Sequence, residues 1–311
     1  MIVSIASGKG GTGKTTVAVN LALLLSRNGS QNVHFLDCDV EEPNAHIFLK
    51  PHIDSFESVG IPIPEIDEQK CTYCGKCAEV CVYNAIAVVH PVRSNPTEQD
   101  VSSLTRTSNG VKDKVLIFPE LCHGCGGCSL LCPEEAISEK EREIGVLEQG
   151  RAEGIKFVHG KLNIGEPMAA PLIRAVKEKI TSHGIAIIDV PPGTSCPVIE
   201  AVKDSDFTIL VTEPTPFGLN DLQLAVETVR KLGLPCGVVI NCSDVGDEKV
   251  KEYCNEEGIP ILAEIPYDRT VAILYSHGIP ILIEGEKYRT IFQQMWDSIE
   301  KEAKQIKKEK R

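Results

Sequence analysis

A glycine-rich stretch near the start of the chain has the residue types needed to bind the phosphates of a nucleotide. The segment SGKGGTGKTT, residues 7–16, matches the spacing G-x-x-x-x-G-K-[ST] through Gly8, Gly13, Lys14 and Thr15. In such a loop the backbone N–H groups surround the phosphates, the lysine reaches the β and γ phosphates, and the hydroxyl binds Mg²⁺. The other loop residues expected to face the nucleotide are Gly10, Gly11, Thr12 and Thr16. An ordinary glycine turn is the alternative, but the strand-like IVSIA before the loop and the helix-like VAVNLALLLSR after it favour a phosphate-binding loop.

Three aspartates could hold the metal ion that accompanies such a nucleotide. Asp37 and Asp39 end the apolar segment VHFLDCD, and Asp189 ends IAIID just before VPPGTSCP. Ligands of open α/β sheets bind at the carboxyl ends of the strands, where carboxylates can order Mg²⁺ and its waters. Strand-end capping is the alternative, because aspartate is common in turns. We therefore expect a nucleoside triphosphate site with Mg²⁺.

Eight cysteines form two groups with the same internal spacing. Each group reads C-x₂-C-x₂-C-x₃-C, and the members are Cys71, Cys74, Cys77, Cys81 and Cys122, Cys125, Cys128, Cys132. This is the spacing of bacterial ferredoxins, in which three thiolates bind one [4Fe–4S] cluster and the fourth binds the other cluster. The expected ligand sets are therefore the first three cysteines of each group with the last of the other. Zinc is the alternative, but zinc sites use four ligands per ion without this doubled pattern.

The segments that would position these residues differ in composition, because most are apolar runs and one part is rich in cysteine and glycine. Short apolar runs separated by helix-like segments predict a mostly parallel sheet covered on both faces, with strands in 2–6, 33–39, 185–190, 207–213, 237–241 and 261–266. The part rich in cysteine and glycine predicts a small inserted α+β domain. The expected domains are a first nucleotide-binding segment at 1–61, the insertion at 62–141 and a second nucleotide-binding segment at 142–311. Within the insertion, the polar stretch from Arg93 to Lys114 is expected to be a mobile surface excursion.

Composition restricts the compartment and the partners. The 311 residues carry a formal net charge of −12, which disfavours binding to nucleic acid or to an anionic membrane. No apolar run reaches the ~20 residues that span a bilayer, and no export signal precedes the first strand. A cytoplasmic location is expected. In that reducing compartment, thirteen cysteines indicate metal or redox chemistry rather than disulfides.

The motifs GKGGTGKTT, DCD and DVPPG together resemble the deviant Walker A ATPases, the family of MinD, ParA, Mrp and the nitrogenase iron protein. The resemblance implies a homodimeric P-loop ATPase in which Lys9 reaches across to the partner's phosphates, although a solvated loop charge is the alternative for this lysine. It also implies that Asp39 positions the attacking water and that Asp37 and Asp189 assist the metal. By the same resemblance, the γ-phosphate is sensed by Gly193 and the adenine is faced by Asn241 and Pro266.

Segments such as LCHGCGGCSLLCPEEAI and GKLNIGEP extend the resemblance to MinD-like ATPases with an inserted ferredoxin domain. Three functions follow: an ATP-gated electron carrier with two [4Fe–4S] clusters, an iron–sulfur or metallocofactor assembly ATPase of the Mrp type, and a redox-sensing positioning ATPase. The first two imply a redox or cofactor-assembly protein as partner. Because the insertion lies between Asp39 and Asp189, we expect it to hang from the segment joining the two phosphate-sensing loops, so that ATP gates the clusters.

The remaining candidates have weaker support. Five cysteines lie outside the two groups, and only Cys196, just after PPG, has a position that suggests reactivity. The histidines, among them His34, His46, His123, His159 and His183, are expected to have surface or packing roles. An apolar stripe that includes Ile291, Trp296 and Ile306 could bind a membrane, but a helix docked on the core is favoured.

Overall fold

The computed structural model describes residues 1–30, 32–90, 113–181 and 183–309, with side chains described up to Ala303. The prediction for the stretch from Arg93 to Lys114 therefore lies outside the described residues, apart from its last two positions. The chain divides into two compact units. Unit 1 comprises residues 1–59, 145–163 and 169–311, and unit 2 comprises residues 60–144 and 164–168.

Unit 1 is built on a large sheet with the order β11-β10-β9-β1-β8-β2-β7-β6-β3 among the described residues. Every predicted strand is confirmed. Continuous apolar runs indicate these strands because a parallel sheet covered on both faces buries the side chains on both sides of each strand. These strands are β1 (Ile2–Ala6), β2 (Val33–Asp37), β8 (Ile185–Asp189), β9 (Phe207–Thr212), β10 (Cys236–Asn241) and β11 (Ile261–Ile265). The parallel strand β7 (Ile155–Leu162) lies beside β2 and was not predicted.

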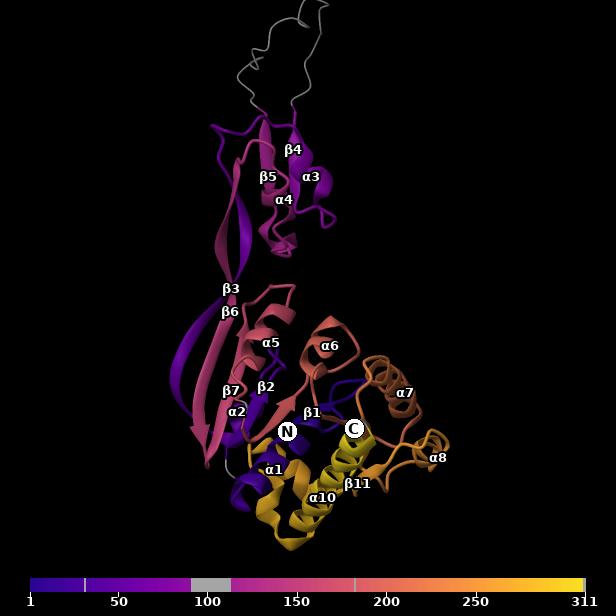
Figure 1. Cartoon of the computed structure of the whole chain (residues 1–311). Helices are drawn as coiled ribbons and strands as arrows, with labels where there is room; N and C mark the ends of the chain where they lie inside the picture. Colours follow the sequence, from indigo (N-terminus) through magenta and orange to yellow (C-terminus); the bar gives the residue numbers. More distant parts are fainter. Residues whose placement is uncertain (31, 91–112, 182, 310–311) are drawn as a thin grey trace, which may run out of the picture. The chain divides into compact units, whose positions relative to one another are not determined.

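Helices cover both faces of this sheet (Figure 1). One face carries α1 (Lys14–Arg27) and α10 (Glu286–Glu309), and the other carries α5 (Ala170–Lys177), α6 (Cys196–Val202) and α7 (Pro216–Lys231). Three further helices are α2 (Ala45–Leu49), α8 (Lys249–Glu256) and α9 (Arg269–Ser276). Helix α10 buries Phe292, Met295, Trp296 and Ile299 in the core, which confirms the docked helix. Within the described part of the chain, no helix is both long and apolar enough to cross a bilayer.

Two long strands connect unit 1 with unit 2. Strand β3 (His52–Ile66) and strand β6 (Ile137–Ala152) each begin in one unit and end in the other. Strand β6 runs antiparallel to β7 and enters the sheet beside Leu162, at the carboxyl end of β7. Both strands occupy the margin of the sheet, with β7 between β6 and β2. The insertion was expected to hang from the segment joining the two phosphate-sensing loops, and β3 does follow the Asp39 loop through α2, whereas β6 is separated from β2 by β7.

Unit 2 is an internal repeat, in which each residue of the first half corresponds to the residue 51 positions later, as Cys71 does to Cys122. Helix α3 (Lys76–Val80) corresponds to α4 (Gly127–Leu130), and each follows a left-handed glycine. The strands β4 (Ile86–Val89) and β5 (Lys114–Ile117) form an antiparallel pair. The halves exchange equivalent bonds, from the Asp67 N–H to the Ala136 carbonyl and from the Phe118 N–H to the Ala85 carbonyl, each at 2.8 Å.

Candidate functional site

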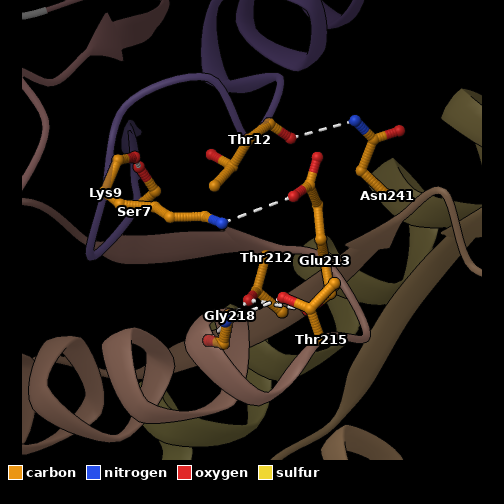
Figure 2. Close-up of polar contacts among 8 residues, drawn as sticks. All are labelled: Ser7, Lys9, Thr12, Thr212, Glu213, Thr215, Gly218 and Asn241. Atoms are coloured by element: carbon orange, nitrogen blue, oxygen red, sulfur yellow. Dashed lines mark hydrogen bonds and ion pairs between the residues drawn. The ribbon is translucent and has the colours of Figure 1, made fainter. Parts of the chain in front are cut away.

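The glycine-rich loop joins β1 to α1, and its backbone is held by a residue from a distant strand. Gly13 has a φ of 98°, and a Cβ at this position would lie 2.7 Å from the Asn241 Nδ2 atom. The same Asn241 amide donates a hydrogen bond of 2.9 Å to the Thr12 carbonyl (Figure 2). Glycine is required at position 13 both because of this backbone conformation and because of the close approach. The contact ties the loop to the end of β10.

An open cavity of about 470 Å³ lies beside the loop, within the size range of small-molecule sites. It is lined by nine residues that were predicted from the sequence: Gly10, Gly11, Gly13, Lys14, Thr15, Thr16, Asp39, Asn241 and Pro266. The cavity also has walls that the sequence analysis missed, formed by Glu42, Asn44, Glu213, Cys242, Tyr267, Asp268 and Tyr275. The other predicted residues do not line this cavity. Gly8 packs on the Asp221 backbone, and the Gly193 N–H donates to the Ser7 carbonyl at 3.0 Å.

Two of the three aspartates are buried and do not line the cavity. Asp37 and Asp189 are register partners on β2 and β8 and are almost fully inaccessible. Both Asp189 carboxylate oxygens are buried and accept no hydrogen bond from the described residues. Burial raises the pKa of Asp189 to about 7, against the opposing effects of Thr15 and Lys14. Burial, reinforced by Asp189, also raises the pKa of Asp37 well above its usual value. A buried cation would relieve this penalty.

Asp39 lines the cavity, whereas Lys9 does not. Burial raises the pKa of Asp39 to about 6, although the charge of Lys14 opposes the shift. The Lys9 ammonium lies 3.5 Å from a carboxylate oxygen of Glu213, in the same chain (Figure 2). Glu213 directly follows β9, and the turn after it is held by a hydrogen bond of 2.9 Å from the Thr212 hydroxyl to the Gly218 carbonyl. The position of Glu213 at a strand's carboxyl end was the signal that could have identified it.

The eight grouped cysteines line two small cavities in unit 2. One cavity is lined by Cys71, Cys74, Cys77 and Cys132, and the other by Cys81, Cys122, Cys125 and Cys128. Each cavity thus receives three cysteines from one half of the repeat and the last cysteine from the other half. No group of three or more histidine, cysteine, aspartate or glutamate side chains is placed to hold a metal ion in the part of the chain that the structure describes.

Backbone N–H groups point at the sulfurs in a pattern that repeats. The Cys71 and Cys122 sulfurs accept from the N–H two residues later, at 3.4 and 3.5 Å. The Cys81 and Cys132 sulfurs accept from the N–H four residues later, at 3.3 Å in both cases. Donors directed at sulfur tune the reduction potential of any cluster that it binds. The linings differ, because the second cavity alone has the stacked pair Tyr83 and His123, whereas each cavity has one carboxylate, Glu134 in the first and Glu139 in the second.

A family model described as the CobQ/CobB/MinD/ParA nucleotide binding domain matches residues 3–281, which is most of the chain. The chain belongs to this family. Membership agrees with the P-loop, the mostly parallel sheet and the cavity beside Lys14, and it makes the fold that of a MinD/ParA-type nucleotide-binding ATPase.

Individual relatives of this MinD/ParA-type chain fall into three groups. An uncharacterised protein of Methanocaldococcus jannaschii is 31% identical over 282 residues, covering 89% of this chain and 90% of the relative. An iron–sulfur cluster carrier protein of Aquifex aeolicus is 26% identical, covering 91% of this chain and 62% of the carrier. Among solved structures, the septum site-determining protein MinD of Pyrococcus horikoshii, in complex with Mg-ADP, aligns with a TM-score of 0.56 and 19% identity over 97% of this chain and 96% of its own. This last likeness shows the fold alone.

The cysteines outside the two groups have dissimilar surroundings in this MinD/ParA-type fold. Cys38 is fully buried, and burial strongly raises the pKa of its thiol. Burial likewise raises the pKa of Cys254 to about 11. Cys196 is exposed at the start of α6, and Cys242 lines the nucleotide cavity with a left-handed φ of 50°. Cys236 is partly buried, and burial raises its pKa.

Proposed function

We propose that this chain is an ATP-hydrolysing iron–sulfur protein in which the nucleotide state controls two [4Fe–4S] clusters and thereby gates electron transfer to or from a partner protein. The observation that carries the proposal is the division of eight cysteines into two four-thiol cavities within a chain that also has a P-loop ATPase fold. Neither feature alone would indicate that ATP hydrolysis is linked to electron transfer. Their presence in one chain is what requires a common explanation.

The residues around the nucleotide cavity fit Mg²⁺-ATP. Lys14 and the loop N–H groups would hold the β and γ phosphates, and Thr15 would bind the metal. The Thr12 hydroxyl and the Asp189 carboxylate are buried without a hydrogen-bond partner among the described residues, as expected for groups that complete a phosphate and metal site. In hydrolysis a water attacks the γ-phosphorus, the bond to the β–γ bridging oxygen breaks, and ADP and phosphate form. Asp39 lines the cavity, and its pKa is raised to about 6; we propose that it orients that water, as the family resemblance implies.

We further propose that the active form is a homodimer. Lys9 does not line the cavity of its own chain, but the family resemblance implies that it serves the partner's phosphates. Its present contact with Glu213 would then describe the separated protomer.

The cysteine cavities fit a four-iron cluster better than a single ion. A cluster binds each thiolate through a different iron, so its ligands stand further apart than those of one ion, and four cysteines around each cavity suit that arrangement. The directed N–H groups at Cys71, Cys81, Cys122 and Cys132 supply the hydrogen bonds that such clusters receive. When bound, the clusters supply one-electron transfer.

The test is a redox titration of anaerobically prepared protein followed by electron paramagnetic resonance. We expect about eight irons and eight sulfides per chain, the content of two [4Fe–4S] clusters, and a change in at least one reduction potential when Mg²⁺-ATP is added. Potentials that are the same with and without Mg²⁺-ATP, while ATP binding persists, would refute the gating.

Single cysteine variants test the grouping. Cys132→Ala should remove the signal of the cluster held by Cys71, Cys74 and Cys77, and Cys81→Ala should remove the other. Cys196→Ala, at an exposed position outside both cavities, is the matched control and should leave both signals intact. Loss of the same signal in both cavity variants would contradict the exchanged ligand sets.

Cluster assembly is the second candidate, because relatives of similar length are named iron–sulfur cluster carrier proteins, such as that of Pyrococcus abyssi at 25% identity over 91% of this chain and 80% of the carrier. A carrier gives up its cluster, whereas an electron carrier keeps it. Rapid cluster transfer to an apo-ferredoxin, together with loss of iron to a chelator, would favour assembly. Clusters that resist the chelator and reduce reversibly would favour electron transfer.

A further inference from the structure

A row of ionisable side chains crosses the sheet from the phosphate end of the nucleotide site toward β6. Asp189 on β8 pairs in register with Asp37 on β2, Asp37 pairs with His159 on β7, and His159 pairs with Glu148 on β6. Register partners of adjacent strands place their side chains on the same face of a sheet. The first three side chains are almost completely buried. Four consecutive strands thus carry one continuous polar row in an otherwise apolar layer.

Helix α2 supports the middle of this row and follows directly on the loop that borders the nucleotide cavity. Asp37 accepts hydrogen bonds of 3.1 Å from the N–H groups of Asp39 and of Ala45, the first residue of α2. The next residue, His46, contacts the His159 ring edge-on, with 5.4 Å between the ring centres. The Nδ1 atoms of His46 and His159 are both buried and without a partner among the described residues. A displacement of Asp39 or Ala45 would therefore shift α2 and, through the ring contact of His46, the His159 side chain.

The row ends on the strand that enters unit 2. The His159 Nε2 atom lies 2.6 Å from Glu148, whose two carboxylate oxygens also accept from the Lys161 ammonium at 2.9 and 3.0 Å. The Glu148 side chain is only 12% exposed, so its bonds are made in a partly dehydrated setting where they are strong. Strand β6 then continues through Gly145 to residues 137–144 of unit 2.

We propose that His159 and Glu148 act as a positioning pair that transmits the occupancy of the phosphate end of the nucleotide site to strand β6. The inference rests on the proposed function, because it names the route by which ATP would influence the cysteine-bearing unit. It is consistent with the topology, since β7 lies between β6 and the strand that carries Asp37. The pair does not touch the nucleotide cavity, so its loss should leave nucleotide binding intact.

Hydrogen exchange of backbone amides, measured by mass spectrometry on the full chain, tests the proposal. In the native protein, Mg²⁺-ATP should slow exchange both in residues 8–16 and in residues 137–152. A coupling of ordinary size predicts an effect in the second segment of about fivefold or more. Glu148→Gln and His159→Gln should keep the protection of residues 8–16 and lose that of residues 137–152.

The matched control is His34→Gln. His34 is also a buried histidine on β2, bonded to the Thr181 hydroxyl at 3.0 Å, but it lies three residues before Asp37, away from the cavity. It should leave both responses unchanged. Because Glu148 is partly exposed, Glu148→Gln provides a folded variant even where His159→Gln is unstable.

Equal protection of residues 137–152 in Glu148→Gln and in the native protein would overturn the proposal. So would a native protein in which Mg²⁺-ATP protects residues 8–16 and leaves β6 unaffected. Neither result depends on the clusters. A failed redox titration with an intact β6 response would instead refute the proposed function and leave this route standing.

Discussion

Replacing Asp189 by asparagine should stabilise the nucleotide-free protein in a pH-dependent manner. The Asp189 carboxylate is buried with no hydrogen-bond partner among the described residues, and burial raises its pKa from 3.8 to about 7. A carboxyl group with a raised folded pKa favours its protonated form, so ionising it opposes folding. This penalty is absent below the unfolded value, grows as the pH rises, and is complete above the folded value. The asparagine side chain of the variant cannot ionise and therefore escapes the penalty.

The shift of about 3 pKa units corresponds to roughly 4 kcal/mol at full ionisation, with 1.36 kcal/mol per unit. About two of those units lie between pH 5 and pH 7. The gain in unfolding free energy of Asp189→Asn should therefore grow by roughly 3 kcal/mol from pH 5 to pH 8. In a chain of this size that is a rise of several degrees in melting temperature.

Differential scanning calorimetry of the nucleotide-free chain at constant ionic strength measures the effect. Asp268→Asn provides a control of opposite sign, because hydrogen bonds from Tyr288 and Thr270 lower the pKa of Asp268. That carboxylate stabilises the fold above its usual pKa, and the benefit is lost as the pH falls through the lowered value, so the control should melt lower at pH 8. With Mg²⁺-ATP present the order for Asp189→Asn should reverse, since the native carboxylate then serves the metal. A variant no more stable than the native protein at pH 8, or equally stabilised at pH 5 and pH 8, would refute the reasoning.

Three further outcomes are expected. Glu213→Gln removes the intramolecular partner of Lys9, and because a partly exposed ion pair contributes about 1 kcal/mol at most, ATP-dependent dimers measured by sedimentation should form up to roughly fivefold more tightly. Asn241→Ala removes one hydrogen bond to the phosphate-binding loop, so calorimetric affinity for Mg²⁺-ATP should fall about fivefold, the effect of about 1 kcal/mol. Glu166→Gln weakens the two-pronged bond from Arg142, at 2.6 and 3.1 Å, and should lower the unfolding free energy of unit 2 by about 1–3 kcal/mol in denaturant titrations.

The central strands could be predicted from the sequence because each is a continuous apolar run between polar turns. Strands β3 and β6 could not, since the exposed parts of each, such as SEKERE in β6, have neither an apolar run nor a regular alternation. Their length is explained by pairing with each other at the margin of the sheet, which is a property of two distant segments rather than of either one.

The site divides in the same way. The P-loop and the eight cysteines are recognised by the spacing of residues that are close in the sequence, so the sequence alone predicts them. The contact of Glu213 with Lys9 and that of Glu148 with His159 both depend on which strands are neighbours and on their register. His159 in particular, for which the sequence supported only a surface or packing role, is buried and bonded because β6 pairs with β7. Such pairings become visible only when the fold is known.

The exchange of the fourth cysteine between the halves of unit 2 bears on how this architecture arose. A chain with only one half would own three neighbouring thiols and a fourth that points to a companion's cavity. The bonds joining Asp67 to Ala136 and Phe118 to Ala85 would likewise lack their acceptors. An ancestor of single length could complete its cavities only by pairing two identical copies, and fusing those copies into one gene would preserve the shared cavities and the two exchanged bonds.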